Sequence, residues 1–403
     1  MQTIKAQEWE WQQESSKSIT FIVTKDCQLA CKYCYLVGKN SKERMSWEIA
    51  RQAIDYILSC EQDMPEQSVV FDFIGGEPFL EIDLIDRICD YLKVEMFRLN
   101  HHWFNSFRFS FTTNGLNYSS PKVQNFIAKN YRHLSVVITI DGNKLKHDMN
   151  RIYKNGDGSY DDVVKNIPIW MEQFPGFGTK VTISSADIPY IKDSVLHLFN
   201  MGMSDVNINC VFEDVWKDGD DLLFEHQLME LADAMIDGSL YTDHYCSFFS
   251  ETIGKPLDPV DDNQNWCGAG VMLAVDAAGN FYPCTRFAGY SLRSKKPIII
   301  GNVRDGIDKN KLRPFLTLDR TTQSRQECID CEVASGCAWC QGENYDAADT
   351  ATIYQRSTAI CKMHKARVRA NNYYWNKLYR KLEMEGRREE FEKSKRSVKS
   401  ETC

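Results

Sequence analysis

The sequence predicts an α/β protein in which a barrel of parallel strands is followed by a separate cysteine-rich domain. Two observations predict this architecture. Six short β-rich segments alternate with helical segments in the first half of the chain, and seven cysteines fall between Cys267 and Cys361 in the second half. The chain has 403 residues, more than a single domain usually holds, which also favours two or three packed units.

The predicted strands are short apolar segments that are rich in β-branched and aromatic residues. In chain order they span Ser18–Thr24, Ser68–Ile74, Phe107–Thr113, Leu134–Ile140, Lys180–Ser184 and Asp205–Phe212. Helical periodicity separates them over Ser46–Ser59, Leu80–Phe97, Pro121–Asn130, Tyr160–Phe174 and Tyr190–Met201. This alternation implies parallel strands joined by right-handed crossovers, with functional side chains at the carboxyl ends of the strands. Periodicity alone leaves a doubly wound open sheet as the alternative to a barrel.

The pattern of the sequence changes after the sixth strand, and this change sets the expected domain boundaries. We expect an N-terminal lead at residues 1–15, the barrel at 16–215, a linker region at 216–262, the cysteine-rich domain at 263–375 and a charged C-terminal helix or tail at 376–403. The last segment alternates Lys and Arg with Glu, which is typical of a solvated helix.

Composition and charge exclude several classes of function. The N-terminus lacks an apolar signal region, and no run of eighteen uncharged apolar residues occurs, so we expect a cytoplasmic protein without a membrane segment. The net charge of -8, from 48 basic and 56 acidic residues, argues against nucleic acid as a partner. Fifteen cysteines in a reducing compartment indicate metal or iron–sulfur chemistry instead.

Three of these cysteines, Cys27, Cys31 and Cys34, lie together in one loop directly after the first predicted strand. Three thiolate ligands leave one iron of a four-iron cluster free to bind an exchangeable group. The spacing arises by chance in a chain of this composition at roughly one or two per cent. A zinc site is the alternative, but neither His nor Cys follows as a fourth ligand before Cys60.

This cysteine loop resembles the cluster motif of the radical S-adenosylmethionine (SAM) superfamily, in which the open iron binds the methionine part of SAM. The resemblance implies a partial (β/α)6 TIM-like barrel of the radical SAM type. Gly75, Gly76 and Glu77, after the second strand, resemble the glycine-rich motif that receives the SAM ammonium group. Two glycines let the backbone approach a ligand closely, and a glutamate accepts a charge-assisted hydrogen bond.

Further SAM contacts are implied by the same resemblance. Thr113 and Asn114 match the position near the SAM ribose, and Tyr33 matches an aromatic position near the adenine. Asp141 ends the fourth strand, and by this likeness Arg151 clamps the SAM carboxylate with a planar, bidentate guanidinium. Each of these residues alone suits an ordinary turn, core or surface position. The resemblance assigns no side chain as a catalytic acid or base.

The downstream cysteines resemble the SPASM domain, which carries two auxiliary clusters in radical SAM enzymes. The crossed pattern of that family implies one cluster held by Cys328, Cys331, Cys337 and Cys361. It implies a second held by Cys267, Cys284 and Cys340, with either Cys246 or a substrate thiolate as the fourth ligand. The alternative is a zinc ribbon built from Cys328, Cys331, Cys337 and Cys340. That alternative leaves the other three cysteines of the domain unexplained.

The resemblance implies a radical SAM oxidoreductase with SAM and three 4Fe-4S clusters, one that binds SAM and two auxiliary clusters. It favours a maturase that generates a 5′-deoxyadenosyl radical and installs a thioether, of the sactipeptide or ranthipeptide type, in a ribosomally synthesised precursor peptide rich in Cys. The expected reductant is a flavodoxin or a ferredoxin.

Two other functions compete with this one. The first is an anaerobic sulfatase-maturing enzyme, in which an Asp that acts as a base follows the cysteine equivalent to Cys284. Here Thr285 stands at that position, which weighs against this function. The second is a non-enzymatic iron–sulfur electron carrier or zinc-stabilised interaction module, against which the barrel motifs argue.

Overall fold

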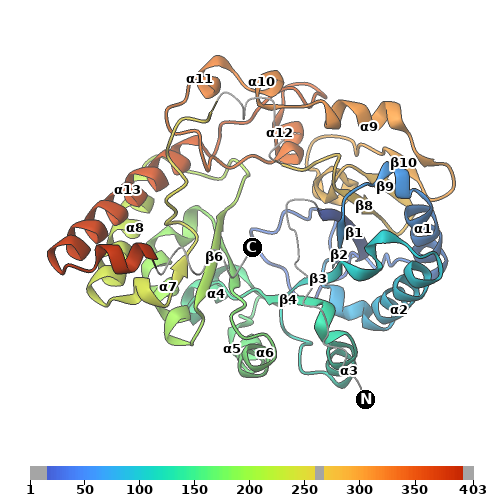
Figure 1. The fold of residues 1–403 in the computed structure, drawn as a ribbon, viewed down its shortest axis with the longest axis horizontal. Helices are drawn as coiled ribbons and strands as arrows, with labels where there is room; N and C mark the ends of the chain where they lie inside the picture. Colours follow the sequence, from blue (N-terminus) through green and yellow to red (C-terminus); the bar gives the residue numbers. More distant parts are fainter. Residues whose placement is uncertain (1–15, 259–266, 394–403) are drawn as a thin grey trace.

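The computed structural model describes residues 16–258 and 267–393, and its first half is a partial barrel of parallel strands surrounded by helices (Figure 1). The expected lead at residues 1–15 and the last ten residues lie outside the described part. The barrel strands are β1 (Ser16–Thr24), β2 (Ser68–Gly75), β3 (Phe107–Thr113), β4 (Leu134–Ile138), β5 (Thr179–Ile183) and β6 (Asp205–Cys210). All six sequence-predicted strands are present, and their ends differ from the prediction by at most two residues.

The strands follow the chain around the barrel without a reversal of order. β1 pairs in parallel with β2, β2 with β3 and β3 with β4, while β5 pairs in parallel with β6. A parallel bridge between Thr139 and Lys180 connects the two groups of strands. A doubly wound sheet requires a reversal of strand order. The observed order is therefore that of the expected partial barrel and not that of the open sheet.

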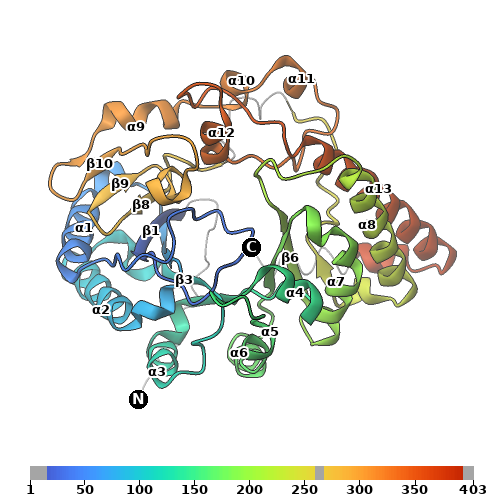
Figure 2. The same ribbon diagram turned by 180° about the vertical axis from the view of Figure 1, so that it is seen from behind.

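Helices cover the outer face of these strands (Figure 2). They are α1 (Trp47–Ser59), α2 (Ile82–Arg98), α3 (Pro121–Asn130), α4 (Lys144–Asn150), α5 (Tyr160–Val164), α6 (Ile167–Gln173) and α7 (Ile191–Asn200). The single helix predicted over Tyr160–Phe174 is divided into α5 and α6, because Pro168 has no N–H to donate within a continuous helix. α4 was not predicted from the sequence.

Side chains of opposite character alternate along the barrel strands. Phe73 and Phe111 stack with ring centroids 5.1 Å apart, and Phe111 meets Phe126 of α3 edge-on, so these aromatic rings fill the layer between strands and helices. Because successive residues of a strand point to opposite faces, Asp72 points into the barrel. There the hydroxyl of Ser18 donates to its carboxylate at 3.4 Å. The inward face of the strands therefore carries polar as well as apolar side chains.

The cysteine-rich domain is attached to the barrel through β8, which pairs in parallel with β1. Its strands are β8 (Leu273–Val275), β9 (Asn280–Tyr282), β10 (Gly301–Asn302) and β11 (Gly306–Ile307). Its helices are α9 (Lys309–Leu316), α10 (Arg320–Gln323), α11 (Gln326–Ile329), α12 (Gln341–Ala347) and α13 (Cys361–Met384). This attachment places the domain beside the open end of the barrel (Figure 1).

Residues 216–262 were expected to be a linker, but their described part, up to residue 258, contributes to the barrel. It contains α8 (Asp220–Asp237) and the short strand β7 (Tyr245–Cys246), which pairs in parallel with β6. α13 lies alongside α8 (Figures 1 and 2), and an ion pair of 2.8 Å joins Lys377 to Asp233. The expected C-terminal helix thus begins earlier than predicted, and its residues Leu378 and Leu382 are fully buried.

Within residues 16–258 and 267–393, no helix combines the length and the apolar character that crossing a membrane requires.

Candidate active site

A cavity of about 500 Å³ lies at the carboxyl ends of the barrel strands. The loop after β1, the ends of β2 to β6 and the cysteine-rich domain all contribute to its wall. The sequence-predicted residues that line it are Cys27, Cys31, Tyr33, Cys34, Gly75, Gly76, Glu77, Thr113, Asn114, Arg151 and Cys340. The structure therefore brings the predicted cluster loop and nearly all predicted SAM contacts to one place.

The glycine turn after β2 holds the cysteine loop in position. The backbone N–H groups of Gly76 and Glu77 donate to the carbonyl oxygens of Thr24 and Asp26 at 3.0 and 2.9 Å. A Cβ at Gly76 would lie 2.1 Å from the carbonyl oxygen of Asp26 and 2.9 Å from Cβ of Cys27. Only glycine permits this approach. The sequence predicted close approach to a ligand, and the structure shows close approach to the loop that carries the cysteines.

Glu77 is 1 % exposed and fastens the end of β3 to the end of β2. Its Oε1 accepts hydrogen bonds from Thr113 Oγ1 at 2.7 Å and from the Phe79 N–H at 3.1 Å, and its Oε2 accepts from the Asn114 N–H at 2.7 Å. Burial raises the pKa of Glu77, and these bonds oppose that effect. A carboxylate offers about four acceptor positions, so about one remains for a ligand.

Tyr33, Asp141 and Arg151 form a buried hydrogen-bonded chain at one side of the cavity. The Tyr33 hydroxyl donates to Asp141 Oδ2 at 2.6 Å, and Arg151 Nη1 donates to the Tyr33 oxygen at 2.9 Å. Burial acts to raise the pKa of Asp141, but the charges of Lys146 and Arg151 outweigh it and lower that pKa. Arg151 is 6 % exposed, and its Nε–H is buried without a hydrogen-bond partner. Asp141 does not line the cavity itself, and it orients Tyr33 and Arg151, which do.

A second cavity, of about 200 Å³, lies inside the cysteine-rich domain. Four cysteines line it, namely Cys328, Cys331, Cys337 and Cys361. Arg356 Nη2 donates to Cys337 Sγ at 3.2 Å. The cysteines that the sequence assigned to one cluster therefore surround one cavity, and Cys340, which a zinc ribbon requires, is not among them.

Cys340 instead lines the first cavity, and Cys267 and Cys284 are its neighbours. Burial raises the pKa of Cys267 to about 11, and the Cys340 thiol adds to that effect. Burial also raises the pKa of Cys284, again with contributions from the other two thiols. The backbone N–H of Gln341 donates to Cys267 Sγ at 3.4 Å. These three cysteines, which we call the cysteine trio, are neighbours in the folded chain.

The structure does not bring Cys246 to the cysteine trio. Cys246 lies on β7, opposite Val206 of β6, and is 1 % exposed in the barrel core. Burial raises its pKa to about 12, and its charged neighbours are Arg367 and Asp205. The sequence could not decide whether Cys246 is the fourth ligand, and its position in the core argues against that role.

Sequence reasoning gave no functional role to several polar residues that line the first cavity, among them Lys180, Cys210, Glu213 and Arg286. Lys180 and Cys210 lie on β5 and β6, and Glu213 follows β6 by three residues. The rule that functional side chains gather at the carboxyl ends of strands was a usable signal for Cys210 and Glu213, but not for Lys180, which is the second residue of β5. Arg286 follows Cys284 in the cysteine-rich domain, and no sequence pattern indicated that it would reach the barrel.

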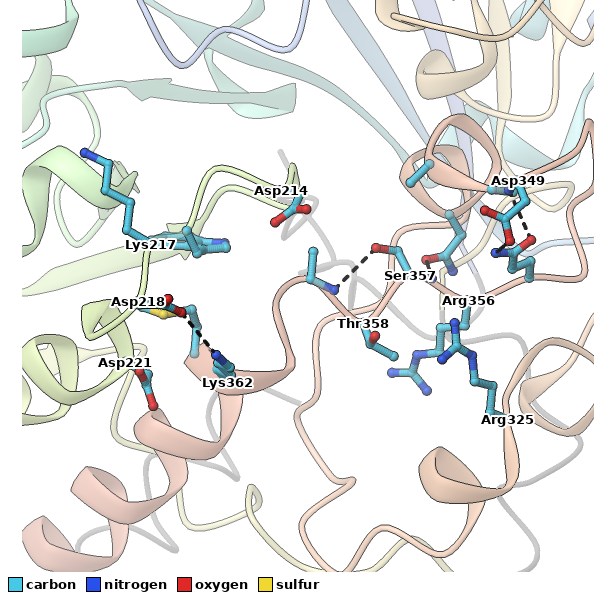
Figure 3. A pocket seen from close by; sticks show the side chains of 17 residues that line it. Asp214, Lys217, Asp218, Asp221, Arg325, Asp349, Arg356, Ser357, Thr358 and Lys362 are labelled. Atoms are coloured by element: carbon cyan, nitrogen blue, oxygen red, sulfur yellow. Dashed lines mark hydrogen bonds and ion pairs between the residues drawn. The ribbon is translucent and has the colours of Figure 1, made fainter.

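A third hollow, a cleft of about 490 Å³, lies between the segment after β6 and the cysteine-rich domain (Figure 3). Its charged residues are Asp214, Lys217, Asp218, Asp221, Arg325, Asp349, Arg356 and Lys362. An ion pair of 3.7 Å joins Lys362 to Asp218 (Figure 3). Asp214 is the chain neighbour of Glu213, which lines the first cavity, so a single backbone segment separates the cleft from that cavity.

Comparison with known proteins relates this arrangement to a group of enzymes. Residues 17–165 match the family described as a 4Fe-4S single cluster domain. The radical SAM cyclopropyl synthase TigE of Paramaledivibacter caminithermalis is 22 % identical over 343 residues, which cover 81 % of this chain and 67 % of TigE. A cysteine-type anaerobic sulfatase-maturating enzyme of Clostridium novyi is 29 % identical over 159 residues, 38 % of this chain and 40 % of that enzyme.

Two solved structures share the fold. Native anSMEcpe with bound AdoMet superposes with a TM-score of 0.66 at 19 % identity, over 91 % of this chain and 98 % of that one. SuiB of Streptococcus suis bound to its precursor peptide SuiA gives a TM-score of 0.57 at 16 % identity, over 85 % of this chain and 75 % of SuiB. Both likenesses extend across the barrel and the cysteine-rich domain.

The fold and the site define an α/β barrel with a cysteine loop at its mouth and a second cysteine-rich domain beside it. In sequence and in fold the chain is similar to radical SAM enzymes that modify peptides and proteins, and its N-terminal part matches a 4Fe-4S domain.

Proposed function

We propose that this enzyme matures a ribosomally synthesised, cysteine-containing peptide by joining a cysteine sulfur to a carbon atom as a thioether. In this proposal Cys27, Cys31 and Cys34 hold the 4Fe-4S cluster that binds SAM. Cys328, Cys331, Cys337 and Cys361 hold one auxiliary cluster, and the cysteine trio holds the other. When bound, the reduced SAM cluster and SAM supply a 5′-deoxyadenosyl radical that removes hydrogen from carbon. A ferredoxin or flavodoxin is the proposed electron donor.

The residues of the first cavity fit SAM in charge and in hydrogen-bonding capacity. Arg151 is buried, its Nε–H lacks a partner, and the thiol of Cys31 is among its electrostatic neighbours. A buried guanidinium with a free donor suits a carboxylate bound beside the cysteine loop. Tyr33 holds the guanidinium from the side, while the turn at Gly76 fixes the cysteine loop. These residues orient the amino-acid part of SAM.

The observation that carries the thioether proposal is the position of the cysteine trio. Cys340 lines the same cavity as Cys27, Cys31 and Cys34, and Cys246 is held elsewhere. Three cysteines leave one iron of a four-iron cluster without a protein thiolate. A substrate cysteine at that position would lie at the edge of the cavity in which carbon is attacked. This juxtaposition supports formation of a bond between sulfur and carbon.

The charged cleft is the proposed path by which the peptide reaches the cavity. It carries both signs of charge, with Asp214 and Asp221 on the barrel side and Arg325 and Asp349 on the side of the cysteine-rich domain. An extended polar peptide finds donors and acceptors along both walls. The likeness to SuiB, whose structure contains a precursor peptide, supports a peptide as the substrate class.

Maturation of a sulfatase is the second candidate function. The likeness to the Clostridium novyi enzyme and to anSMEcpe supports it. The residue after Cys284 argues against it, because Thr285 replaces the Asp expected of that group and a threonine hydroxyl is not an effective base.

The two candidates are distinguished by the mass of the product. Anaerobically reconstituted enzyme is incubated with SAM, dithionite and the cysteine-containing peptide encoded next to its gene, and the peptide is analysed by tandem mass spectrometry. Thioether formation removes two hydrogens per crosslink and links two residues in the fragment spectrum. One hydrogen would leave carbon as an atom, and the other would leave the thiol as a proton, with the remaining electron passing to an auxiliary cluster. Conversion of a cysteine to an aldehyde would identify a sulfatase-type reaction and refute the thioether proposal.

A further inference from the structure

We propose that Glu213 is the base that removes the proton from the substrate cysteine thiol, and that Arg286 stabilises the resulting thiolate beside the cysteine trio. This inference rests on the thioether function proposed above. It assigns the catalytic acid–base role that the sequence left open.

Thioether formation requires a base because the sulfur loses its proton before or as it bonds to carbon. Thr285 cannot take the role of the expected Asp. Among the described residues that line the cavity, the carboxylates are Glu77 and Glu213. Glu77 already accepts three hydrogen bonds, two of which fasten the end of β3 to the end of β2. Glu213 is the carboxylate that remains available to a substrate.

The geometry leaves one oxygen of Glu213 available. Its Oε1 accepts a hydrogen bond from Arg286 Nη2 at 2.8 Å. Its Oε2 has no hydrogen-bond partner among the described residues, and both side chains are 14 % exposed. The carboxylate is thus fixed by one oxygen while the other remains able to accept a proton.

Arg286 is held against the cysteine trio by contacts on several sides. Its guanidinium lies over the Tyr35 ring at 4.6 Å from the centroid, and its Nη2 also donates to Glu343 Oε2 at 3.0 Å. A Cβ at Gly342 would stand 2.3 Å from Cβ of Arg286, so glycine is needed for the arginine to pack there. Among the groups that favour its charged form, the thiol of Cys340 contributes most.

The proton balance of the step is simple. The thiol S–H bond breaks, its proton moves to Glu213 Oε2, and the electron pair stays on sulfur as a thiolate that faces Arg286. A free thiol has a pKa of about 8.5 and a glutamic acid one of about 4.3, so this transfer needs stabilisation of the thiolate. The guanidinium of Arg286 supplies a positive charge for that purpose. The charges that face Glu213 are Arg286, Arg293 and Glu343.

Lys180 is another basic group on the cavity wall, which also carries Lys39 and Arg151, and its surroundings differ from those of Glu213. Its charged neighbours are Asp72 on β2 and Asp141, which follows β4 by three residues. No thiol is among its electrostatic neighbours in the described part of the chain. Glu213, by contrast, is bonded to the arginine that neighbours Cys340. We therefore assign the thiol proton to Glu213 and use Lys180→Met as a test of the competing assignment.

The first test compares wild type, Glu213→Gln and Glu225→Gln. The control breaks a glutamate–arginine pair of 2.6 Å with Arg369 on the outer helices. At pH 7 we expect Glu213→Gln to lower the crosslinking rate about 10²- to 10⁴-fold, the usual contribution of a general base. 5′-Deoxyadenosine formation and iron content should stay near wild type. The rate should recover as the pH rises towards 8.5 and above, because the substrate thiol then ionises without a base.

Three outcomes would overturn the assignment of Glu213. They are wild-type crosslinking by Glu213→Gln at pH 7, a deficit that does not change between pH 7 and pH 9, and a deficit reproduced with the same pH recovery by Lys180→Met. A wild-type enzyme that forms no crosslink with the cysteine peptide would instead overturn the proposed function itself, so the two failures are distinguishable.

The second test does not depend on turnover. Reduced enzyme is titrated without SAM with the tripeptide N-acetyl-Gly-Cys-Gly-amide, and the electron paramagnetic resonance (EPR) spectrum of the auxiliary clusters is recorded. We expect the tripeptide, but not its serine analogue, to change the spectrum of wild type at pH 7. Glu213→Gln should require pH 8.5 or above for the same change. An identical response of both proteins at pH 7 would refute the role of Glu213 in thiol ionisation.

Discussion

Replacement of Arg151 by lysine tests the proposed SAM carboxylate site. Lysine keeps the positive charge but cannot present two parallel N–H groups to a carboxylate. In the structure Arg151 Nη1 donates a hydrogen bond to the Tyr33 oxygen, and the buried Nε–H of Arg151 has no hydrogen-bond partner. The variant therefore loses at least one charge-assisted hydrogen bond to the ligand.

The magnitude follows from that count of bonds. A hydrogen bond to a charged group contributes about 1.5–3 kcal/mol, and each 1.4 kcal/mol is a factor of ten in affinity. We expect Arg151→Lys to raise the dissociation constant of SAM about 10- to 150-fold, while the iron content stays unchanged. Equilibrium dialysis of SAM against the anaerobic, reconstituted protein measures this constant directly.

A matched control separates loss of the ligand contact from loss of any buried arginine. Arg108 is half-buried on β3, donates to the carbonyl oxygen of Leu134 at 2.8 Å and does not line the cavity. Arg108→Lys should bind SAM as wild type does. Binding of SAM by Arg151→Lys within twofold of wild type would refute the reasoning that Arg151 holds the carboxylate.

Three further predictions concern the clusters and the stability of the chain. Gly76→Ala should displace the cysteine loop, because the new Cβ would lie 2.1 Å from the Asp26 carbonyl oxygen. Iron analysis should then show a loss of about four iron atoms per chain. An unchanged iron content would contradict the packing argument. Cys328→Ala should likewise lose about one cluster, whereas Cys246→Ala should keep the full iron content. Equal losses of iron in the two variants would mean that Cys246 is a ligand. Burial acts to raise the pKa of Asp346, but hydrogen bonds from the 293–295 segment lower it to about 2 from 3.8. The carboxylate therefore stabilises the fold above pH 3.8, and this contribution is lost as the pH falls through 2. Asp346→Asn should cost on the order of 2 kcal/mol in urea unfolding of the apo-protein at pH 7 and much less at pH 2, and an equal cost at both values would contradict this linkage.

Much of the barrel was predictable because its signals are local. Each barrel strand is a short β-rich segment, and the order of such segments with helices fixes a parallel topology. The split of the helix over 160–174 and the presence of α4 depend on tertiary contacts, so periodicity did not resolve them. The role of the 216–262 segment was missed because its acidic composition resembles a linker, although Leu228 and Leu231 of α8 are fully buried.

The candidate site divides in the same way. The spacing of Cys27, Cys31 and Cys34 alone predicted a cluster loop. The parallel topology predicted that residues at the carboxyl ends of the strands would lie near it. The pair of Glu213 and Arg286 joins residues 73 positions apart in the chain, so only the folded structure shows it. The sequence also could not show whether Cys246 is a cluster ligand, because sequence distance does not reveal that β7 extends the barrel wall beside β6.

The central claim is that one iron beside the cysteine loop lacks a protein ligand and binds SAM. The most direct measurement is pulsed electron–nuclear double resonance on the reduced enzyme with SAM that carries oxygen-17 in its carboxylate. We predict a hyperfine coupling between the labelled oxygen and the cluster that disappears when Cys27, Cys31 and Cys34 are replaced by alanine. A protein that contains only zinc, or a cluster whose spectrum shows no coupling to labelled SAM, would contradict the account.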